Sequence, residues 1–161
     1  MKKVKIYTDG ACSGNPGDGG WAAILLYNGH EKEIAGYEKD ATNNRMELKA
    51  AIEALKCLKE PCEAELYSDS SYIVDAFNSN WLENWKSNGW INSSKDEVKN
   101  IDLWKELEKL CSIHKVRWVK VKGHSGNEYN NRCDKLAVNE IKKNREKQEP
   151  QNITDIGTGE K

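Results

Sequence analysis

Hydrophobic and polar positions alternate with the period of a β-strand at the start of the chain. The alternation runs from Lys3 to Ala11 and is followed by a dense run of turn-forming residues from Ser13 to Gly20. A second β-rich stretch, Trp21 to Tyr27, ends at Asn28-Gly29, a dipeptide typical of hairpin turns, and a third stretch covers Glu31 to Glu38. The pattern predicts an antiparallel meander of three strands.

The periodicity then becomes helical. Apolar residues recur at helical spacing from about Asn44 to Leu58, directly after Thr42-Asn43-Asn44, which offers N-cap chemistry. A short strand is predicted from Ala64 to Ser68. It ends at Asp69-Ser70-Ser71, where a capping residue can begin a second helix. The middle of the chain therefore predicts a helix, a strand and a helix.

The second half of the chain adds three helical segments and one strand. They are predicted at Trp81 to Trp90, Ile101 to Ile113, Val116 to Val121 (the strand) and Glu128 to Ile141. Residues 144–161 lose nearly all large apolar side chains, so we expect one folded domain at 1–143 and a disordered polar tail. The element order predicts an α/β fold: a five-stranded mixed sheet, with the meander joined by parallel strands and helices on both faces.

Length and composition narrow the function. A chain of 161 residues leaves no room for a second catalytic domain, and its net charge of -1 means that local basic patches or metal ions must hold any polyanion. The longest apolar run, Trp21 to Tyr27, is too short to cross a bilayer, and no signal-peptide core follows Met1. We expect a cytoplasmic protein with no membrane partner. The five cysteines, an odd number without CxxC spacing, predict reduced, mostly buried thiols and no zinc site.

Four acidic residues stand out because the predicted elements bring them toward one place. Asp9 ends the first strand and Asp69 ends the fourth, and ligand sites in such sheets lie beyond strand ends. Glu47 and Asp134 lie at the edges of the apolar stripes of the first and last helices. For any one of them a cap, a turn or a solvated position is the ordinary interpretation. Four together can bind two Mg²⁺ ions, which clamp a phosphoryl transfer.

Short strings around these acids are specific in combination. They are Tyr7-Thr8-Asp9-Gly10-Ala11-Cys12-Ser13-Gly14-Asn15-Pro16-Gly17, Thr42-Asn43-Asn44-Arg45-Met46-Glu47-Leu48, Ser68-Asp69-Ser70, and Lys122-Gly123-His124-Ser125-Gly126 followed by Asn130-Asn131-Arg132-Cys133-Asp134. In this order and spacing they closely resemble bacterial type 1 ribonuclease H, from about Val4 to Ile141. The resemblance implies the ribonuclease H-like fold and endonucleolytic hydrolysis of the RNA strand of RNA/DNA hybrids, which leaves 3'-hydroxyl and 5'-phosphate ends.

The resemblance also implies two Mg²⁺ ions, for which Mn²⁺ can substitute, and assigns roles to the acids. Asp9 would bridge both ions, Asp134 would help hold the ion that activates the attacking water, and Glu47 with Asp69 would hold the other. His124, in a Gly-flanked loop, would assist proton transfer or product release, because an imidazole titrates near neutral pH. Without the motif, His124 is an ordinary loop histidine. We expect a monomer with no obligate protein partner.

Substrate-binding residues follow from the same resemblance. An enzyme selective for RNA has to contact the 2'-hydroxyl, which DNA lacks. Cys12, Asn15, Asn43 and Asn44 match family positions that touch the hybrid, and their turn and cap chemistry is compatible with that role. Ser71 stands where relatives often have glutamine, so its contact with substrate is open.

In the family, residues 80–100 correspond to a protruding basic handle that grips the DNA strand. Here Trp81, Trp85 and Lys86 are the candidates for that contact, although packing within a small helical subdomain is the ordinary interpretation for the two tryptophans and for Trp104. The basic and acidic residues of the stretch balance to zero: Lys86, Lys95 and Lys99 against Glu83, Asp96 and Glu97. We therefore expect weaker, salt-sensitive hybrid binding than a basic handle would give.

A second basic group is Lys115, Arg117, Lys120 and Lys122. It is either ordinary strand-surface charge or a patch that steers phosphates toward His124, and the sequence favours neither interpretation.

Other functions are open to test. A non-catalytic hybrid-binding module would favour lysines over an anionic pocket, so the four acids argue against it. Half of a sugar-kinase or actin-like ATPase would need a second domain, and a DNA-strand-transfer enzyme would accept substrates without 2'-hydroxyls. The glycine-rich run from Ser13 to Gly20 lacks GxGxxG and Walker spacing and precedes a strand, which excludes a nucleotide loop of either type.

Overall fold

One mixed sheet forms the centre of the molecule. The computed structural model describes the backbone of residues 1–122 and 127–157 and the side chains of 1–122 and 127–145. Strands β1 to β3 form an antiparallel meander, β4 pairs parallel to β1, and β5 pairs parallel to β4, which gives the order β3-β2-β1-β4-β5. The strands are β1 Lys2–Cys12, β2 Gly17–Tyr27, β3 His30–Ala41, β4 Cys62–Ser68 and β5 Lys115–Lys120.

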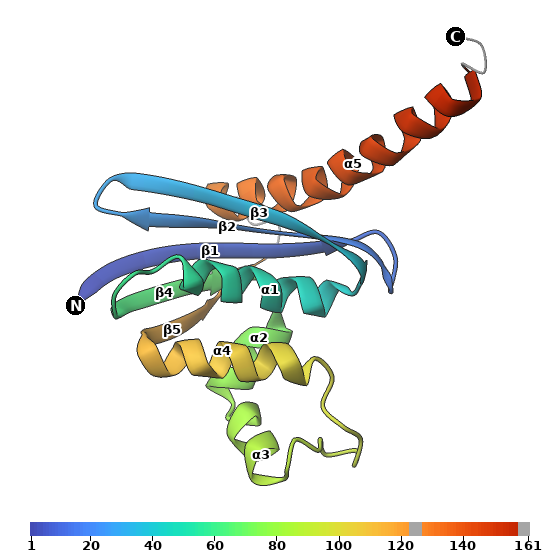
Figure 1. The fold of residues 1–161 in the computed structure, drawn as a ribbon. Helices are drawn as coiled ribbons and strands as arrows, with labels where there is room; N and C mark the ends of the chain where they lie inside the picture. The colour runs from blue at the N-terminus through green and yellow to red at the C-terminus, as the bar shows by residue number, and fades with distance from the viewer. Residues whose placement is uncertain (123–126, 158–161) are drawn as a thin grey trace.

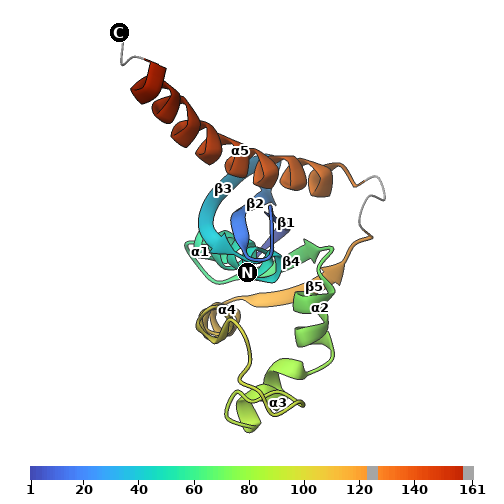
Figure 2. The same cartoon turned by 90° about the vertical axis from the view of Figure 1, so that its right-hand side faces the viewer.

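Helices cover both faces of this sheet, as the sequence predicted (Figure 1). They are α1 Asn43–Lys56, α2 Ser71–Asn78, α3 Trp81–Ser87, α4 Ile101–Ile113 and α5 Glu128–Gly157. Helix α5 lies on one face across β1 and β2, while α1, α2 and α4 lie on the other, and α3 projects away from the sheet beyond α2 (Figure 2). The predicted α/β class, with one five-stranded mixed sheet, is confirmed.

The core has two parts, one on each side of the sheet. The larger lies under α1, α2 and α4 and contains the fully buried Leu48, Leu66 and Trp104. The smaller lies under α5, where Ile24 of β2 packs with Cys133. The helices each bury one apolar stripe, whereas β1 and β2 contribute side chains to both parts, because successive residues of a strand point to opposite faces.

The first loop is shorter than the turn-forming residues indicated. Gly19 and Gly20 pair with Cys12 and Ala11 of β1, so β2 begins at Gly17. The glycines serve close packing: a Cβ on Gly20 would lie 2.0 Å from the carbonyl oxygen of Ala137 in α5. A glycine in a strand often marks such a close backbone approach, which composition does not distinguish from a turn.

The last helix is longer than predicted. Its backbone continues to Gly157, so residues 144–157 are helical where the sequence led us to expect disorder. Charged and amide residues have adequate helix propensity and can extend a helix that packing has already begun, without an apolar face. The division into a domain at 1–143 and a tail stays a prediction. No helix in the described residues is long and apolar enough to span a membrane.

The five cysteines are free thiols, as predicted. Only Cys62 and Cys133 are buried, so the expectation that most of them are buried was wrong. Cys12 is the last residue of β1, where its thiol donates a hydrogen bond to the Ala41 carbonyl at 3.2 Å.

Candidate active site

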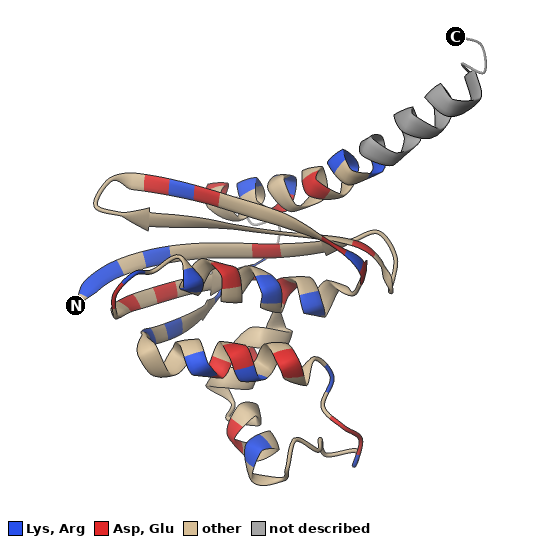
Figure 3. Cartoon of the chain, in the orientation of Figure 1, with Lys and Arg blue, Asp and Glu red and all other residues tan. Residues whose placement is uncertain are grey.

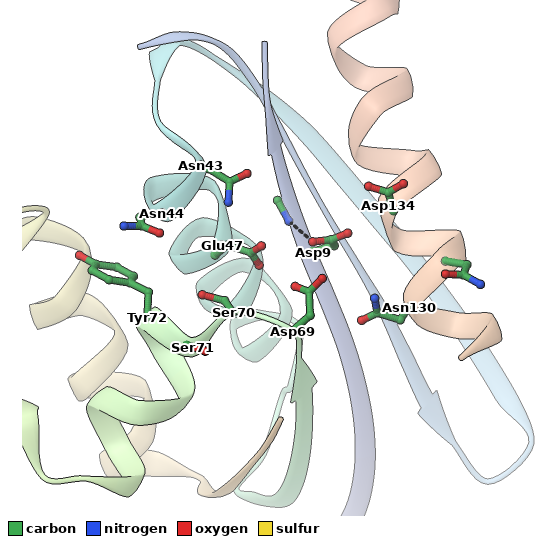
Figure 4. A pocket seen from close by; sticks show the side chains of 12 residues that line it. Asp9, Asn43, Asn44, Glu47, Asp69, Ser70, Ser71, Tyr72, Asn130 and Asp134 are labelled. Carbon is green, nitrogen blue, oxygen red and sulfur yellow. Dashed lines mark hydrogen bonds between the residues drawn. The ribbon is translucent and has the colours of Figure 1, made fainter. Parts of the chain in front are cut away.

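Three carboxylates from distant parts of the sequence meet at one end of the sheet. Asp9 comes from β1, Glu47 from α1 and Asp69 from the turn after β4, and one oxygen of each lies within 4.8 Å of the others. Asp134 of α5 lines the same cleft, whose volume is about 420 Å³. Figure 4 shows Asp9, Glu47 and Asp69 pointing toward one another, with Asp134 facing them from α5. The structure thus brings together the four acids that the sequence singled out.

Local chemistry explains the position of each side chain. Parallel β1 and β4 end at the same edge of the sheet, which places Asp9 beside Asp69. A Cβ on Gly10 would lie 2.6 Å from the backbone nitrogen of Glu47, so the glycine permits the approach of α1 to β1. The Gly10 N–H also donates to the Asp9 carboxylate at 2.9 Å.

The turn that carries Asp69 is held by hydroxyl groups. The Ser68 hydroxyl accepts the N–H of Ser70 at 3.0 Å, and the Ser70 hydroxyl caps α2 by accepting the N–H of Ile73 at 3.4 Å. The predicted caps of α1 and α2 are therefore present, since Thr42 accepts the N–H of Arg45 at 3.2 Å in the same way.

Burial and mutual repulsion raise the pKa values of two of the clustered acids. Burial, followed by repulsion from Asp69, raises the pKa of Asp9 to about 7. Burial, followed by repulsion from Asp9, raises the pKa of Glu47 well above its ordinary value. These are the directions expected when carboxyl groups lose water and face like charges. A cation bound among these acids would lower the pKa values of both Asp9 and Glu47, because it would stabilise the charged carboxylates.

Unpartnered oxygens show that the site fits a hard cation. Within the described part of the chain, Glu47 Oε1 and Asn130 Oδ1 are buried without a hydrogen-bond partner, and both residues line the cleft. A buried acceptor without a partner costs about 1–3 kcal/mol, and carboxylate and amide oxygens are the ligands that Mg²⁺ prefers. The donor set is thus that of a divalent-metal site.

Comparison with known proteins decides the family. A family model described as RNase H matches residues 1–142. The chain belongs to the RNase H family. It is 72% identical to a Ribonuclease H from Acetivibrio thermocellus over 147 residues, which is 91% of this chain and 100% of that protein.

Solved structures agree with this assignment. The chain is similar to LC9-RNase H1, a type 1 RNase H with the type 2 active-site motif, at 30% identity and a TM-score of 0.77, over 86% of this chain and 72% of that one. It shares the fold of LC11-RNase H1, solved in complex with an RNA/DNA hybrid, at 23% identity and a TM-score of 0.64, over 87% and 97% of the two chains.

Membership of the RNase H family establishes the activity. The chain is an endonuclease that hydrolyses the RNA strand of RNA/DNA hybrids, as the four sequence strings implied. The family also excludes half of a sugar-kinase or actin-like ATPase as an identity for this chain. His124 lies outside the described residues, so its role stays a prediction.

The five predicted substrate-binding residues outside the handle fall into two groups. Asn43, Asn44 and Ser71 line the cleft with the acids. Cys12 ends β1 and Asn15 lies in the β1–β2 turn, and neither is among the residues that line the cleft. Their contact with the hybrid stays a prediction.

Sequence reasoning missed part of the cleft. Asn130 and Asn131 line the cleft, although in the sequence they stand out only as part of the motif that contains Asp134. Tyr72 also lines it, and its hydroxyl accepts the indole N–H of Trp104 at 3.0 Å and an N–H of Asn100 at 3.3 Å. The position of Tyr72, one residue after the start of α2, gave no such signal on its own.

The handle combines exposed aromatic surface with paired charge. The core interpretation holds for Trp104, which is fully buried, and for Trp85, whose ring packs edge-on against it at 5.2 Å. It was wrong for Trp81, which is 40% exposed because α3 projects beyond the core. Lys86 forms ion pairs with Glu108 and Glu83. Figure 3 shows acidic and basic residues side by side on α3 and α4, consistent with the balanced charge of the stretch.

Proposed function

We propose that the chain hydrolyses its hybrid substrate with two divalent cations, Mg²⁺ or in its place Mn²⁺, held by Asp9, Glu47, Asp69 and Asp134. The observation that carries the proposal is the meeting of three carboxylate oxygens within 4.8 Å, beside a buried Glu47 oxygen without a hydrogen-bond partner. Acids from β1, α1, the β4–α2 turn and α5 would not converge in a cleft that only had to bind an anionic backbone. The acids therefore argue against a non-catalytic hybrid-binding module, in agreement with the endonuclease activity of the family.

When bound at such carboxylates, divalent cations polarise the phosphate and activate water for in-line attack. The chain's own residues supply position and selectivity. Asn43 and Asn44 at the start of α1, with Ser71 at the start of α2, place amide and hydroxyl groups in the cleft, where a 2'-hydroxyl can both donate and accept. His124 follows β5 in the chain and would assist proton transfer or product release. The products would carry 3'-hydroxyl and 5'-phosphate ends.

The partner in this proposal is the hybrid itself. Trp81 and Trp85 would offer aromatic faces to the DNA strand, and Lys86 would contribute a charge that Glu108 partly offsets. We further propose that the chain acts as a monomer in the cytoplasm and needs no membrane or second protein.

A cleavage assay tests the proposal. An end-labelled RNA/DNA hybrid, duplex RNA, duplex DNA and single-stranded RNA would each be incubated with Mg²⁺, Mn²⁺ or EDTA. We expect cutting of the hybrid's RNA strand alone, with 5'-phosphate products, and no cutting in EDTA. Cleavage that persists in EDTA would refute the metal site. Hybrid binding without cleavage by a folded protein would favour the binding module.

A further inference from the structure

The structure separates the four basic residues around β5 that the sequence had grouped. Trp118 is buried and stacks on Phe77 of α2, with ring centroids 4.4 Å apart. Because side chains alternate along a strand, Lys120 lies on the same side as Trp118, whereas Lys115 and Arg117 lie on the opposite face. Arg117 there pairs with Glu65 at 2.7 Å.

Lys120 reaches the rim of the carboxylate cleft. Its ammonium nitrogen donates a hydrogen bond to the Ser71 hydroxyl at 2.7 Å, and Ser71 lines the cleft that contains the catalytic acids. Two contacts hold the end of β5 here: Val121 N–H donates to the Ser68 carbonyl at 2.9 Å, and Asn78 donates to the Trp118 carbonyl at 3.2 Å. The lysine therefore projects from an anchored strand end, next to the turn that carries Asp69.

Among the described residues the partner of Lys120 is neutral, which distinguishes it from Arg45, the neighbour of the cleft residue Asn44. Arg45 is paired with Glu38 and Asp102. The hydroxyl of Ser71 orients the Lys120 ammonium without cancelling its charge. Lys120 is exposed and held in place, and no acidic side chain among the described residues pairs with it. Such a cation at the edge of an anionic cleft is suited to bind a phosphate.

We propose that Lys120 binds a backbone phosphate of the RNA strand next to the bond that is cut, and that Ser71 acts as its positioning residue. The proposal rests on the active site described above, because Ser71 shares that cleft. The short hydroxyl leaves room for a lysine from the neighbouring strand to reach the substrate.

The first test compares Lys120→Gln with Lys115→Gln, which removes the same charge from the other end and the opposite face of the same strand. Hybrid binding would be measured in EDTA over a range of salt concentrations, so that the result is independent of cleavage. For Lys120→Gln we expect the dissociation constant to rise about 3- to 10-fold and the slope of log K against log salt to lose roughly 0.7–0.9, the value of one phosphate contact. Equal behaviour of the two variants would overturn the proposal.

The role of Ser71 has its own readout. Ser71→Ala keeps the lysine charge, so we expect weaker binding, by about 2- to 3-fold, with an unchanged salt slope. Combined with Lys120→Gln, the serine change should have a smaller effect than it has alone, because effects that pass through a shared contact are not additive. Additive effects would show that Ser71 does not position Lys120.

A substrate scan locates the phosphate. Hybrids with a single neutral methylphosphonate at successive positions of the RNA strand would be compared between the wild-type chain and Lys120→Gln. We expect one position next to the cleavage site at which the two proteins bind equally well, because that linkage no longer has a charge to lose. A difference that persists at every position would refute a discrete phosphate contact. Metal-dependent cleavage by the wild-type chain tests the active site separately.

Discussion

At the scale of single residues, Asp69 gives the sharpest test of the metal site. It is half-buried in the turn after β4, and its carboxylate raises the pKa of Asp9 by repulsion. Asp69→Asn keeps the volume of the side chain and removes the charge. We expect hydrolysis to fall by more than about 100-fold while hybrid binding remains, since the loss of one metal ligand removes most of the electrostatic catalysis. Wild-type activity in this variant would contradict the proposed set of ligands.

His114 predicts a pH dependence of stability far from the cleft. It is buried, and its Nδ1 accepts the N–H of Cys62 at 3.1 Å, which requires that ring nitrogen to be unprotonated. Burial lowers the pKa of His114 below its ordinary value. The unfolded chain therefore takes up a proton before the folded chain does, so this contribution is present above about pH 6.5 and is lost as the pH falls below it.

The measurement is the free energy of unfolding in urea at several values between pH 7.5 and 5. Because burial raises the pKa of Asp9 to about 7, within the same range, the difference between wild type and His114→Gln is the informative quantity. We expect that difference to shrink as the pH falls. His30→Gln, at an exposed position in β3, serves as the control and should show no such trend. A difference that is constant with pH would mean that His114 keeps the same charge in both states.

At the scale of elements, α5 contacts the loop between β1 and β2. Arg145 donates to the Ser13 hydroxyl at 2.7 Å and to the Asp18 carboxylate at 3.4 Å. The Tyr37 hydroxyl donates to the other oxygen of Asp18 at 2.7 Å. Arg145 lies beyond the predicted domain boundary at residue 143. It thus helps to hold the loop that carries Asn15, a predicted substrate contact.

Arg145→Ala should loosen this loop without unfolding the protein. We expect KM for the hybrid to rise about 2- to 5-fold with kcat nearly unchanged, because exposed ion pairs contribute at most about 1 kcal/mol to stability. Lys143→Ala is the matched control, since Lys143 pairs only with Glu140 of its own helix in the described contacts. Equal KM values for the two variants would show that the loop needs no support from α5.

At the scale of the whole molecule, charge distribution sets the strength of hybrid binding. The chain carries 25 basic and 26 acidic residues, and Glu108 of α4 pairs with Lys86 of the handle. We expect Glu108→Gln to leave this lysine with only its ion pair to Glu83 at 3.5 Å and so to make it more available to the DNA strand. The change would lower the dissociation constant and steepen its salt dependence by up to one phosphate contact. Glu106→Gln, two residues away on α4 and paired with Lys56 instead of Lys86, controls for the change in net charge. Binding that is independent of salt in all three proteins would refute the prediction of a salt-sensitive handle.

The pattern of the chain by itself determined the order of elements, the α/β class and the four acids. Each depends on local chemistry: alternation with period two for β1, helical spacing for α1 and α4, and a strand end before Asp69. The predicted strand end at Asp9 was wrong, because β1 continues to Cys12 by pairing with β2. The bounds of α4 were predicted to the residue because its apolar stripe begins and ends sharply.

Only the tertiary structure decided which side chains share a space. Gly20 looks like a turn residue until α5 packs within 2.0 Å of where its Cβ would lie. Lys120 looks like one of four similar cations until strand alternation and the start of α2 bring it to Ser71. Asn130 and Tyr72 join the cleft for the same reason. Contacts between residues far apart in sequence depend on how whole elements pack, and the local periodicity of the sequence does not predict that packing.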